Sequence, residues 1–335
     1  MKKWHFPFLL LLISGVIFIK IRHDKTPHHT FQSTEGRVFG TIYHAKYQYS
    51  TDLLSDITST LQKVDNSLSM FNKESCISKI NAGTTDIPDS LFVEIFTLSQ
   101  EISKITDGNF DPTVAPLVSA WGFGKGEKQA TDSASIDSIL EFVGWNKIEL
   151  ANNRIIKKDP RITLDFSAIA KGYGADCIAK MFEEKGIQNY MIEIGGEIVC
   201  KGNNPKGEPW KIGINKPIED SIPTQEIQNI LTIRNCAMAT SGNYRNYYMK
   251  DGKKIAHTIN PKTGFPIQTE ILSSTVLAPS CATADAYATS FMVMGLEKTK
   301  EIVDSNPEIE AYIIYADENG NHNVWCTETI KGLLK

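Results

Sequence analysis

The chain lacks any Cys-x-x-Cys pair, so its sequence gives no support for a zinc site or a redox dithiol. Its six cysteines are widely spaced along 335 residues. No spacing among them selects a disulfide pairing, so the presence of one or two disulfides stays open. Most of these cysteines are expected to be small buried hydrophobes.

An excess of positive charge is also missing. The formal net charge is -4 and no basic stripe is present, which argues against nucleic acid as a partner. With 41% apolar and 22% charged residues, the composition is that of a globular protein. The length suits one elaborated domain or two fused halves. The function must therefore be inferred from individual sites.

The N-terminal segment predicts export but lacks two processing signals. Residues 1–22 carry two early lysines and an apolar run at 6–19, as a signal or membrane anchor does. Val16 stands where a lipoprotein signal requires cysteine, which excludes lipidation there. No Ala-x-Ala site follows and basic residues flank the far end, so an uncleaved anchor is favoured. Residues 23–35 predict a disordered tether, and 36–335 a folded domain.

Apolar periodicity predicts the first elements of that domain. A strand is expected around residues 37–49, followed by a helix over about 53–68 with Ser50 or Thr51 as its cap. A second amphipathic helix is expected to start after Pro88 and stop at residues 107–108. Their apolar faces are predicted to form core.

Hairpin signals recur from residue 147 onward, with helices inserted in blocks at about 168–184, 281–294 and 297–306. Strands that return through hairpins indicate an α+β fold of layered antiparallel or mixed sheets, and not a doubly wound parallel sheet. The turn signals are Asn152-Asn153, Gly195-Gly196, Asp251-Gly252 and Asn319-Gly320.

Two residues near the C-terminus suit a hard metal ion. Asp285 and Thr289 lie four apart in a predicted helix, so their oxygens share one face. Magnesium usually takes one or two protein carboxylates and fills its shell with water and phosphate oxygens. The alternative interpretation is a surface carboxylate beside a packed threonine.

A second segment, residues 165–176, suits an anion. Lys171 lies at a predicted helix start beside Gly172 and Gly174, where free N–H groups and the helix dipole favour negative charge. A lysine there can neutralise a phosphate. The alternative is a solvated lysine at a helix start.

Three further segments are candidates to line a site. Residues 110–124 form an apolar, proline-punctuated stretch that predicts a rigid loop on which a planar ring can stack. Residues 239–245 and 257–266 flank the Asp251-Gly252 hairpin, so they are expected at the same end of adjacent strands. His257 is then a candidate for proton transfer, although a lone histidine is more often structural.

Taken in order, these segments resemble the ApbE family, the FAD:protein FMN transferases. The resemblance runs from about residue 37 to 330 and rests on an ordered series of segments. They are residues 39–43, 65–81, 110–124, 165–176, 195–197, 240–245, 257–266 and 284–289.

The resemblance implies a T-fold-like core and a magnesium-dependent enzyme. Such an enzyme splits FAD, joins the FMN phosphate to a threonine or serine hydroxyl of a target protein, and releases AMP. Implied targets are exported flavoproteins, including subunits of membrane redox pumps. With the N-terminal segment, this places the domain on the periplasmic side of a bacterial inner membrane.

The resemblance also implies residue roles. The metal would be held by the main-chain carbonyl of Ala168 and the side chains of Asp285 and Thr289. His257, near the reacting phosphate, is assigned as general base, with Asp165 as the alternative. Contacts with FAD are implied for Phe39, Phe71, Ala120, Trp121, Gly122, Asp165, Lys171 and Ile259.

The chain departs from the family pattern at four positions. Phe39 replaces a usual methionine, Phe71 a frequent tyrosine, and Asn260 a common aspartate. Ala288 replaces an acid, which removes at most one metal ligand that water can substitute. Two other functions stay open: an FAD pyrophosphatase that yields FMN and AMP, and a non-catalytic exported flavin-binding protein.

Overall fold

The computed structural model describes residues 30–124, 131–217, 226–243, 247–250 and 253–334. The predicted anchor and most of the predicted tether lie outside these residues. Strand β1 spans Phe31–Val38, so residues 31–35 belong to the sheet and their assignment to the tether was wrong. Only one side of this edge strand is partly covered, and its polar residues therefore look like tether in the sequence. Within the described residues, no helix is both long and apolar enough to cross a membrane.

The predicted first strand is a hairpin. Strand β2, Thr41–Gln48, pairs antiparallel with β1 through a turn at Phe39 and Gly40. Both turn residues have positive φ, 49° and 75°, as a tight hairpin turn requires. Phe39 is an unusual residue for that conformation, and Phe39-Gly40 is not among the residue pairs typical of hairpin turns.

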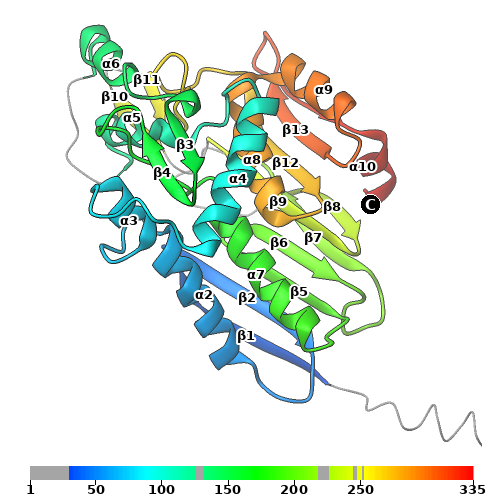
Figure 1. The fold of residues 1–335 in the computed structure, drawn as a ribbon. Coiled ribbons are helices and arrows are strands. Elements are labelled where there is room, and N and C mark those ends of the chain that lie inside the picture. The colour runs from blue at the N-terminus through cyan, green and yellow to red at the C-terminus, as the bar shows by residue number, and fades with distance from the viewer. Residues whose placement is uncertain (1–29, 125–130, 218–225, 244–246, 251–252, 335) are drawn as a thin grey trace, which may run out of the picture.

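A central sheet of eight strands has the order β1-β2-β5-β6-β9-β12-β13-β14 (Figure 1). Every pairing in it is antiparallel, which confirms the α+β prediction. Its other strands are β5 Tyr190–Ile194, β6 Glu197–Lys201, β9 Cys236–Gly242, β12 Ile271–Ala278, β13 Glu310–Ala316 and β14 His322–Cys326.

In the part of the chain that the structure describes, the remaining strands form three two-stranded sheets, which are also antiparallel. Predicted turns at 152–153, 195–196 and 319–320 join β3–β4, β5–β6 and β13–β14. The fourth predicted turn, 251–252, lies outside the described residues, although its flanking strands pair. The small sheets are β3 Ile148–Ala151 with β4 Arg154–Lys157, β7 Trp210–Asn215 with β8 Ile227–Ile233, and β10 Tyr247–Lys250 with β11 Lys253–Ala256.

Helices cover one face of the central sheet (Figure 1). The two predicted early helices are present as α2 and α4, but the predicted cap of α2 was wrong: Asp52 accepts the N–H of Leu54 instead. The longer helices are α2 Leu54–Leu68, α4 Ser90–Ile105, α7 Ala170–Glu184, α8 Cys281–Met294 and α9 Leu296–Ser305. The shorter ones are α3 Cys76–Asn81, α6 Ser133–Leu140, η2 Trp145–Lys147 and α10 Glu328–Leu333.

Alternation along the central strands fills two cores. On β9 and β12, Ala239 and Val276 face the helices, whereas Met238 and Leu277 face the β7–β8 sheet and α10. The sheet is therefore buried on both faces near its middle, which gives a rigid platform for side chains at the strand ends. All six cysteines are free thiols, two buried and four half-buried.

The segment 110–124 is not the loop that its prolines suggested. It contains η1, Pro112–Val114, and α5, Ala115–Ala120. Each proline falls in a first helical turn, where its missing N–H is not needed and its fixed φ is favourable.

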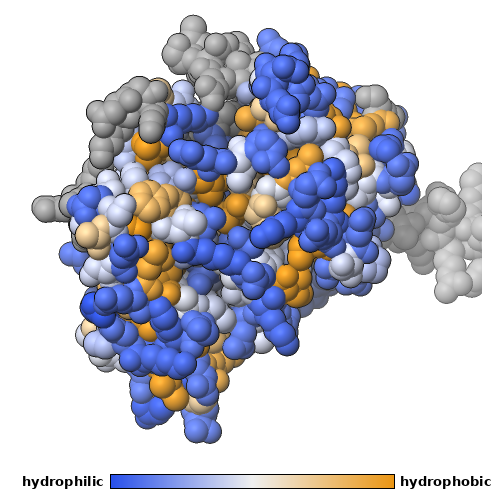
Figure 2. Space-filling model, turned by 90° about the horizontal axis from the view of Figure 1, so that it is seen from above, coloured by the Kyte–Doolittle hydropathy of each residue, from blue (hydrophilic) through white to orange (hydrophobic). Residues whose placement is uncertain are grey.

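The outer surface seen from above is mainly hydrophilic with small separate apolar patches (Figure 2).

Candidate functional site

A cavity of about 450 Å³ opens where the start of α7 and the middle of α8 meet the strand ends of β6 and β9. This volume is in the range of small-molecule and cofactor sites. Segments 109–124 and 257–261 form its other walls. Eight of the predicted site residues line it: Phe71, Asp165, Ala168, Lys171, His257, Ile259, Asp285 and Thr289.

Four predicted flavin contacts do not line this cavity. Phe39 packs in the β1–β2 turn against Gly174 of α7. Ala120 and Trp121 are buried, and the indole Nε1 of Trp121 donates to the carbonyl of Gly264 over 2.8 Å. Gly122, which follows Trp121, is exposed and does not line the cavity. From the same segment, the residues that do line the cavity are Phe110, Asp111, Pro112, Val114, Val118, Phe123 and Gly124.

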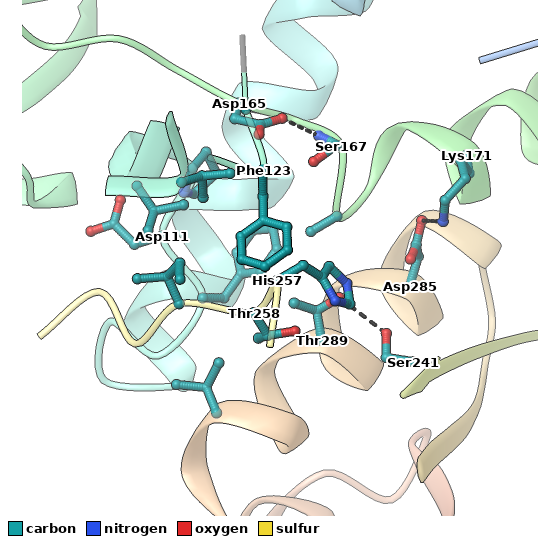
Figure 3. Close-up of a pocket in the computed structure, with 18 of the residues that line it drawn as sticks. Asp111, Phe123, Asp165, Ser167, Lys171, Ser241, His257, Thr258, Asp285 and Thr289 are labelled. Atoms are coloured by element: carbon teal, nitrogen blue, oxygen red, sulfur yellow. Dashed lines mark hydrogen bonds and ion pairs between the residues drawn. The ribbon is translucent and has the colours of Figure 1, made fainter. Parts of the chain in front are cut away.

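A lysine and two carboxylates meet on one wall of the cavity. The Lys171 ammonium lies 2.9 Å from Oε1 of Glu197 and 3.6 Å from Oδ2 of Asp285. Both carboxylates are buried, with side chains 4% and 3% exposed. Figure 3 shows Lys171 and Asp285 facing each other across the gap between α7 and α8. The ammonium predicted to neutralise a phosphate is thus held by acids that belong to the same site.

Burial and mutual attraction oppose each other in this cluster. Burial raises the pKa of Glu197, while the Lys171 ammonium lowers it and the Asp285 carboxylate raises it. Burial also raises the pKa of Asp285, against the lowering by Lys171. Burial lowers the pKa of Lys171, but the two carboxylates outweigh burial and raise it overall. The ammonium is therefore a fixed positive charge.

Helices α7 and α8 are held in contact by two backbone-to-carboxylate connections. The N–H of Gly172 donates to Oδ2 of Asp285 over 3.2 Å. One turn further on, Asp176 accepts the N–H groups of Cys281 and Ala282, each over 2.8 Å. A Cβ on Gly172 would overlap the backbone carbonyl of Cys281, so only glycine permits this approach. The register of α8, and with it the place of Asp285, is set by α7.

The predicted metal ligands are all hard oxygen donors on this cavity. Besides Asp285, Ala168 lines the wall, and Oγ1 of Thr289 lies 3.2 Å from Oγ of Ser241. The recorded bonds of Asp285 use Oδ2, which leaves its second oxygen for a ligand. No group of three or more His, Cys, Asp or Glu suited to a metal occurs in the described residues. A carboxylate, a hydroxyl and a carbonyl fit magnesium, which keeps much of its shell for water and phosphate.

The proton-transfer candidates also line the cavity, with His257 beside Thr289 and Asp165 further off beside Ser167 (Figure 3). His257 follows β11, and its ring meets Phe123 edge-on with centroids 6.3 Å apart. Asp165 accepts the N–H of Ser167 over 2.7 Å, and burial raises the pKa of its carboxyl. Thr258 donates to Asn243 over 3.0 Å, so segments 239–245 and 257–266 do lie together as predicted. Arg245, in the first of them, lies outside the described residues.

Sequence reasoning assigned no role to Glu197. The residue follows Gly195-Gly196 as the first of β6, between the buried Ile194 before the turn and the buried Ile198 after it. A carboxylate at a hairpin base among buried neighbours is the signal that was available. Asp111 was also passed over, but its oxygens already accept N–H groups of Thr113 and Trp145 and the Thr113 hydroxyl, so it holds its own segment.

The fold is that of a known class of flavin transferases. The solved structure of flavin transferase ApbE from Vibrio cholerae superposes with a TM-score of 0.81 at 33% identity, covering 91% of this chain and 99% of that one. The FAD:protein FMN transferase of Haemophilus influenzae is 37% identical over 86% of this chain and 87% of its own length. That of Escherichia coli K12 is 32% identical over 98% and 97%. Residues 39–313 match the ApbE family, and the chain belongs to that family.

Proposed function

We propose that this protein is an FAD:protein FMN transferase that moves FMN from FAD to a threonine or serine hydroxyl of a target protein and releases AMP. The observation that carries the proposal is the convergence of phosphate-neutralising, metal-ligating and proton-accepting candidates on one cavity. Membership of the ApbE family and similarity to named transferases support the same activity.

The transfer joins the acceptor oxygen to the FMN phosphorus and breaks the bond from that phosphorus to the bridging oxygen, which leaves with AMP. Such a step is accelerated chiefly by positioning and by charge neutralisation on the phosphate oxygens. The Lys171 ammonium supplies a fixed positive charge on the cavity wall. Magnesium held by Ala168, Asp285 and Thr289 would add charge neutralisation on the pyrophosphate.

The acceptor hydroxyl must lose its proton during the attack. His257 is the proposed general base, because a neutral imidazole accepts a proton near neutral pH. Asp165 lines the same cavity and is the alternative base. The raised pKa of its carboxyl makes it a better proton acceptor than an ordinary aspartate.

Incubation with FAD, magnesium chloride and an exported flavoprotein subunit tests the proposal. Intact-mass spectrometry of the target is expected to show the gain of one FMN phosphoester, and EDTA is expected to prevent it. Free FMN with an unmodified target would assign the protein as an FAD pyrophosphatase. Bound, unchanged FAD would assign it as a flavin-binding protein.

The proposed setting is the periplasmic side of a bacterial inner membrane, with the N-terminal segment as an uncleaved anchor. The features that support it are the basic and apolar pattern of residues 1–22 and the absence of a lipoprotein cysteine. Proposed targets are exported flavoproteins, including subunits of membrane redox pumps. Membrane fractionation followed by N-terminal sequencing separates an anchor from a cleaved signal.

A further inference from the structure

Glu197 has a carboxylate that its surroundings only half satisfy. Oε1 binds the Lys171 ammonium at 2.9 Å, whereas Oε2 is buried without a hydrogen-bond partner in the described structure. The side chain is 4% exposed and lines the cavity. A buried acid with an unpaired oxygen is costly, so its presence at a site calls for a function.

The ammonium that Glu197 binds is also close to the candidate metal ligand. Lys171 lies 3.6 Å from Oδ2 of Asp285, longer than its contact with Glu197. An ammonium paired directly with Asp285 would neutralise the carboxylate and repel a cation approaching it. The two acids therefore compete for one lysine, and Glu197 has the shorter contact.

We propose that Glu197 is a positioning residue that holds the Lys171 ammonium away from Asp285, so that Asp285 stays available to a divalent cation. The inference rests on the proposed function in assigning Asp285 to the metal. Two helices and a strand supply the three groups, and the α7–α8 contacts fix Asp285 in place. With Asp285 fixed, the position of the lysine decides how well a cation competes.

Binding of Mn²⁺ alone to the purified protein, followed by electron paramagnetic resonance of the free ion, tests this positioning. Glu197→Leu is expected to raise the dissociation constant about tenfold, the equivalent of about 1.4 kcal/mol. Glu197→Gln keeps a carbonyl acceptor for the ammonium and is expected to lose much less. In Lys171→Met/Glu197→Leu the competing charge is gone, so the constant is expected to return close to the wild-type value.

Glu193→Gln is the matched control. Glu193 lies on β5 of the same hairpin, is half-buried and does not line the cavity, so Mn²⁺ binding should not change. Unchanged binding in Glu197→Leu, or a double variant that binds no better than Glu197→Leu, would overturn the inference. If Glu197→Leu does not fold, Glu197→Gln and Lys171→Met/Glu197→Gln give the same comparison, with a smaller expected change in the dissociation constant.

A crystal structure of metal-free Glu197→Leu supplies a readout that does not depend on transfer. The ammonium of Lys171 is expected to move onto Asp285, well inside the present 3.6 Å. A lysine that stays in place would contradict the positioning role. If the variants bind Mn²⁺ in the predicted pattern but the wild-type protein transfers no FMN, only the proposed function is overturned.

Discussion

Helix α7 lies between two cavities, and one acid in each is bonded in a different way. On one side lies the proposed site, where, among the described residues, Oε2 of Glu197 has no hydrogen-bond partner and Asp285 is bonded through Oδ2. On the other side a cavity of about 360 Å³ lies between α4, α7 and the start of α8. There Asp176 accepts two backbone N–H groups, one on each oxygen, and Glu94 accepts the hydroxyl of Tyr173 over 2.7 Å.

Asp176 therefore stabilises the fold, whereas Glu197 and Asp285 each keep an oxygen available to a ligand. Both cavities contain carboxylates and a lysine, so composition alone does not distinguish them. The difference lies between Asp176, whose two oxygens both accept backbone N–H groups, and Glu197, whose Oε2 has no partner in the described structure. We expect changes beside the proposed site to alter activity, and changes beside the second cavity to alter stability.

The largest expected effect follows from Asp285→Asn. Removing the charge from the proposed metal ligand should lower the rate of FMN transfer about a hundred- to a thousand-fold, while FAD binding is weakened far less. Rates come from intact-mass spectrometry of the target, and binding from flavin fluorescence. Normal turnover in this variant would show that the metal is held elsewhere.

Gly172→Ala tests the helix contact that both cavities share. Its Cβ would overlap the carbonyl of Cys281, and separating α7 from α8 should cost about 3 kcal/mol or more in the free energy of unfolding. Transfer by the folded fraction should fall as well, because Asp285 moves with α8. Gly332→Ala in α10 is the control, since its Cβ meets no atom within 4 Å and should leave stability equal or higher.

Asp176 should give stability a characteristic pH dependence. Burial raises the pKa of its carboxyl to about 6 although the N–H groups of Ala282 and Cys281 lower it. The folded state then holds a proton more tightly than the unfolded chain, so this contribution falls as the pH rises from about 4 to about 6, by at most about 3 kcal/mol. The difference in unfolding free energy between wild type and Asp176→Asn isolates it. A difference that grows with pH would mean that the helix N–H groups outweigh burial.

The smallest effect is expected from Tyr173→Phe. Loss of the hydrogen bond to Glu94, whose side chain is exposed, should lower the free energy of unfolding by about 1 kcal/mol. The rate of FMN transfer should stay within a factor of two or so, because the hydroxyl points to the second cavity. Thermal melts and the transfer assay measure the two quantities. A large loss of transfer would connect that cavity to the reaction.

Features encoded by neighbouring residues could be predicted from the sequence. The hairpins at Asn152-Asn153 and Gly195-Gly196 follow from turn chemistry, since both need positive φ. Helix α8 has the predicted bounds, and Asp285 and Thr289 both line the cavity.

Features that depend on distant contacts could not be predicted. Glu197 contacts Lys171 only because β6 packs against α7 and α8, and no local sequence pattern predicts that packing. Trp121 packs in a buried cluster with Ile136 and Ile259, and the carbonyl of Gly264, far along the chain, accepts its indole N–H. Strand β1 looked like tether because an edge strand needs few apolar residues.

If residues 1–22 are a retained membrane anchor, the early start of β1 limits how far the folded domain can lie from the membrane. The sheet begins at Phe31, so a segment joining residue 22 to it spans at most about 30 Å even when fully extended. If residues 1–22 stay in the bilayer, the cavity can serve only acceptor hydroxyls presented close to the membrane surface. Target proteins would then be selected first by the distance of their acceptor hydroxyl from the membrane, and only afterwards by contacts with side chains of the cavity.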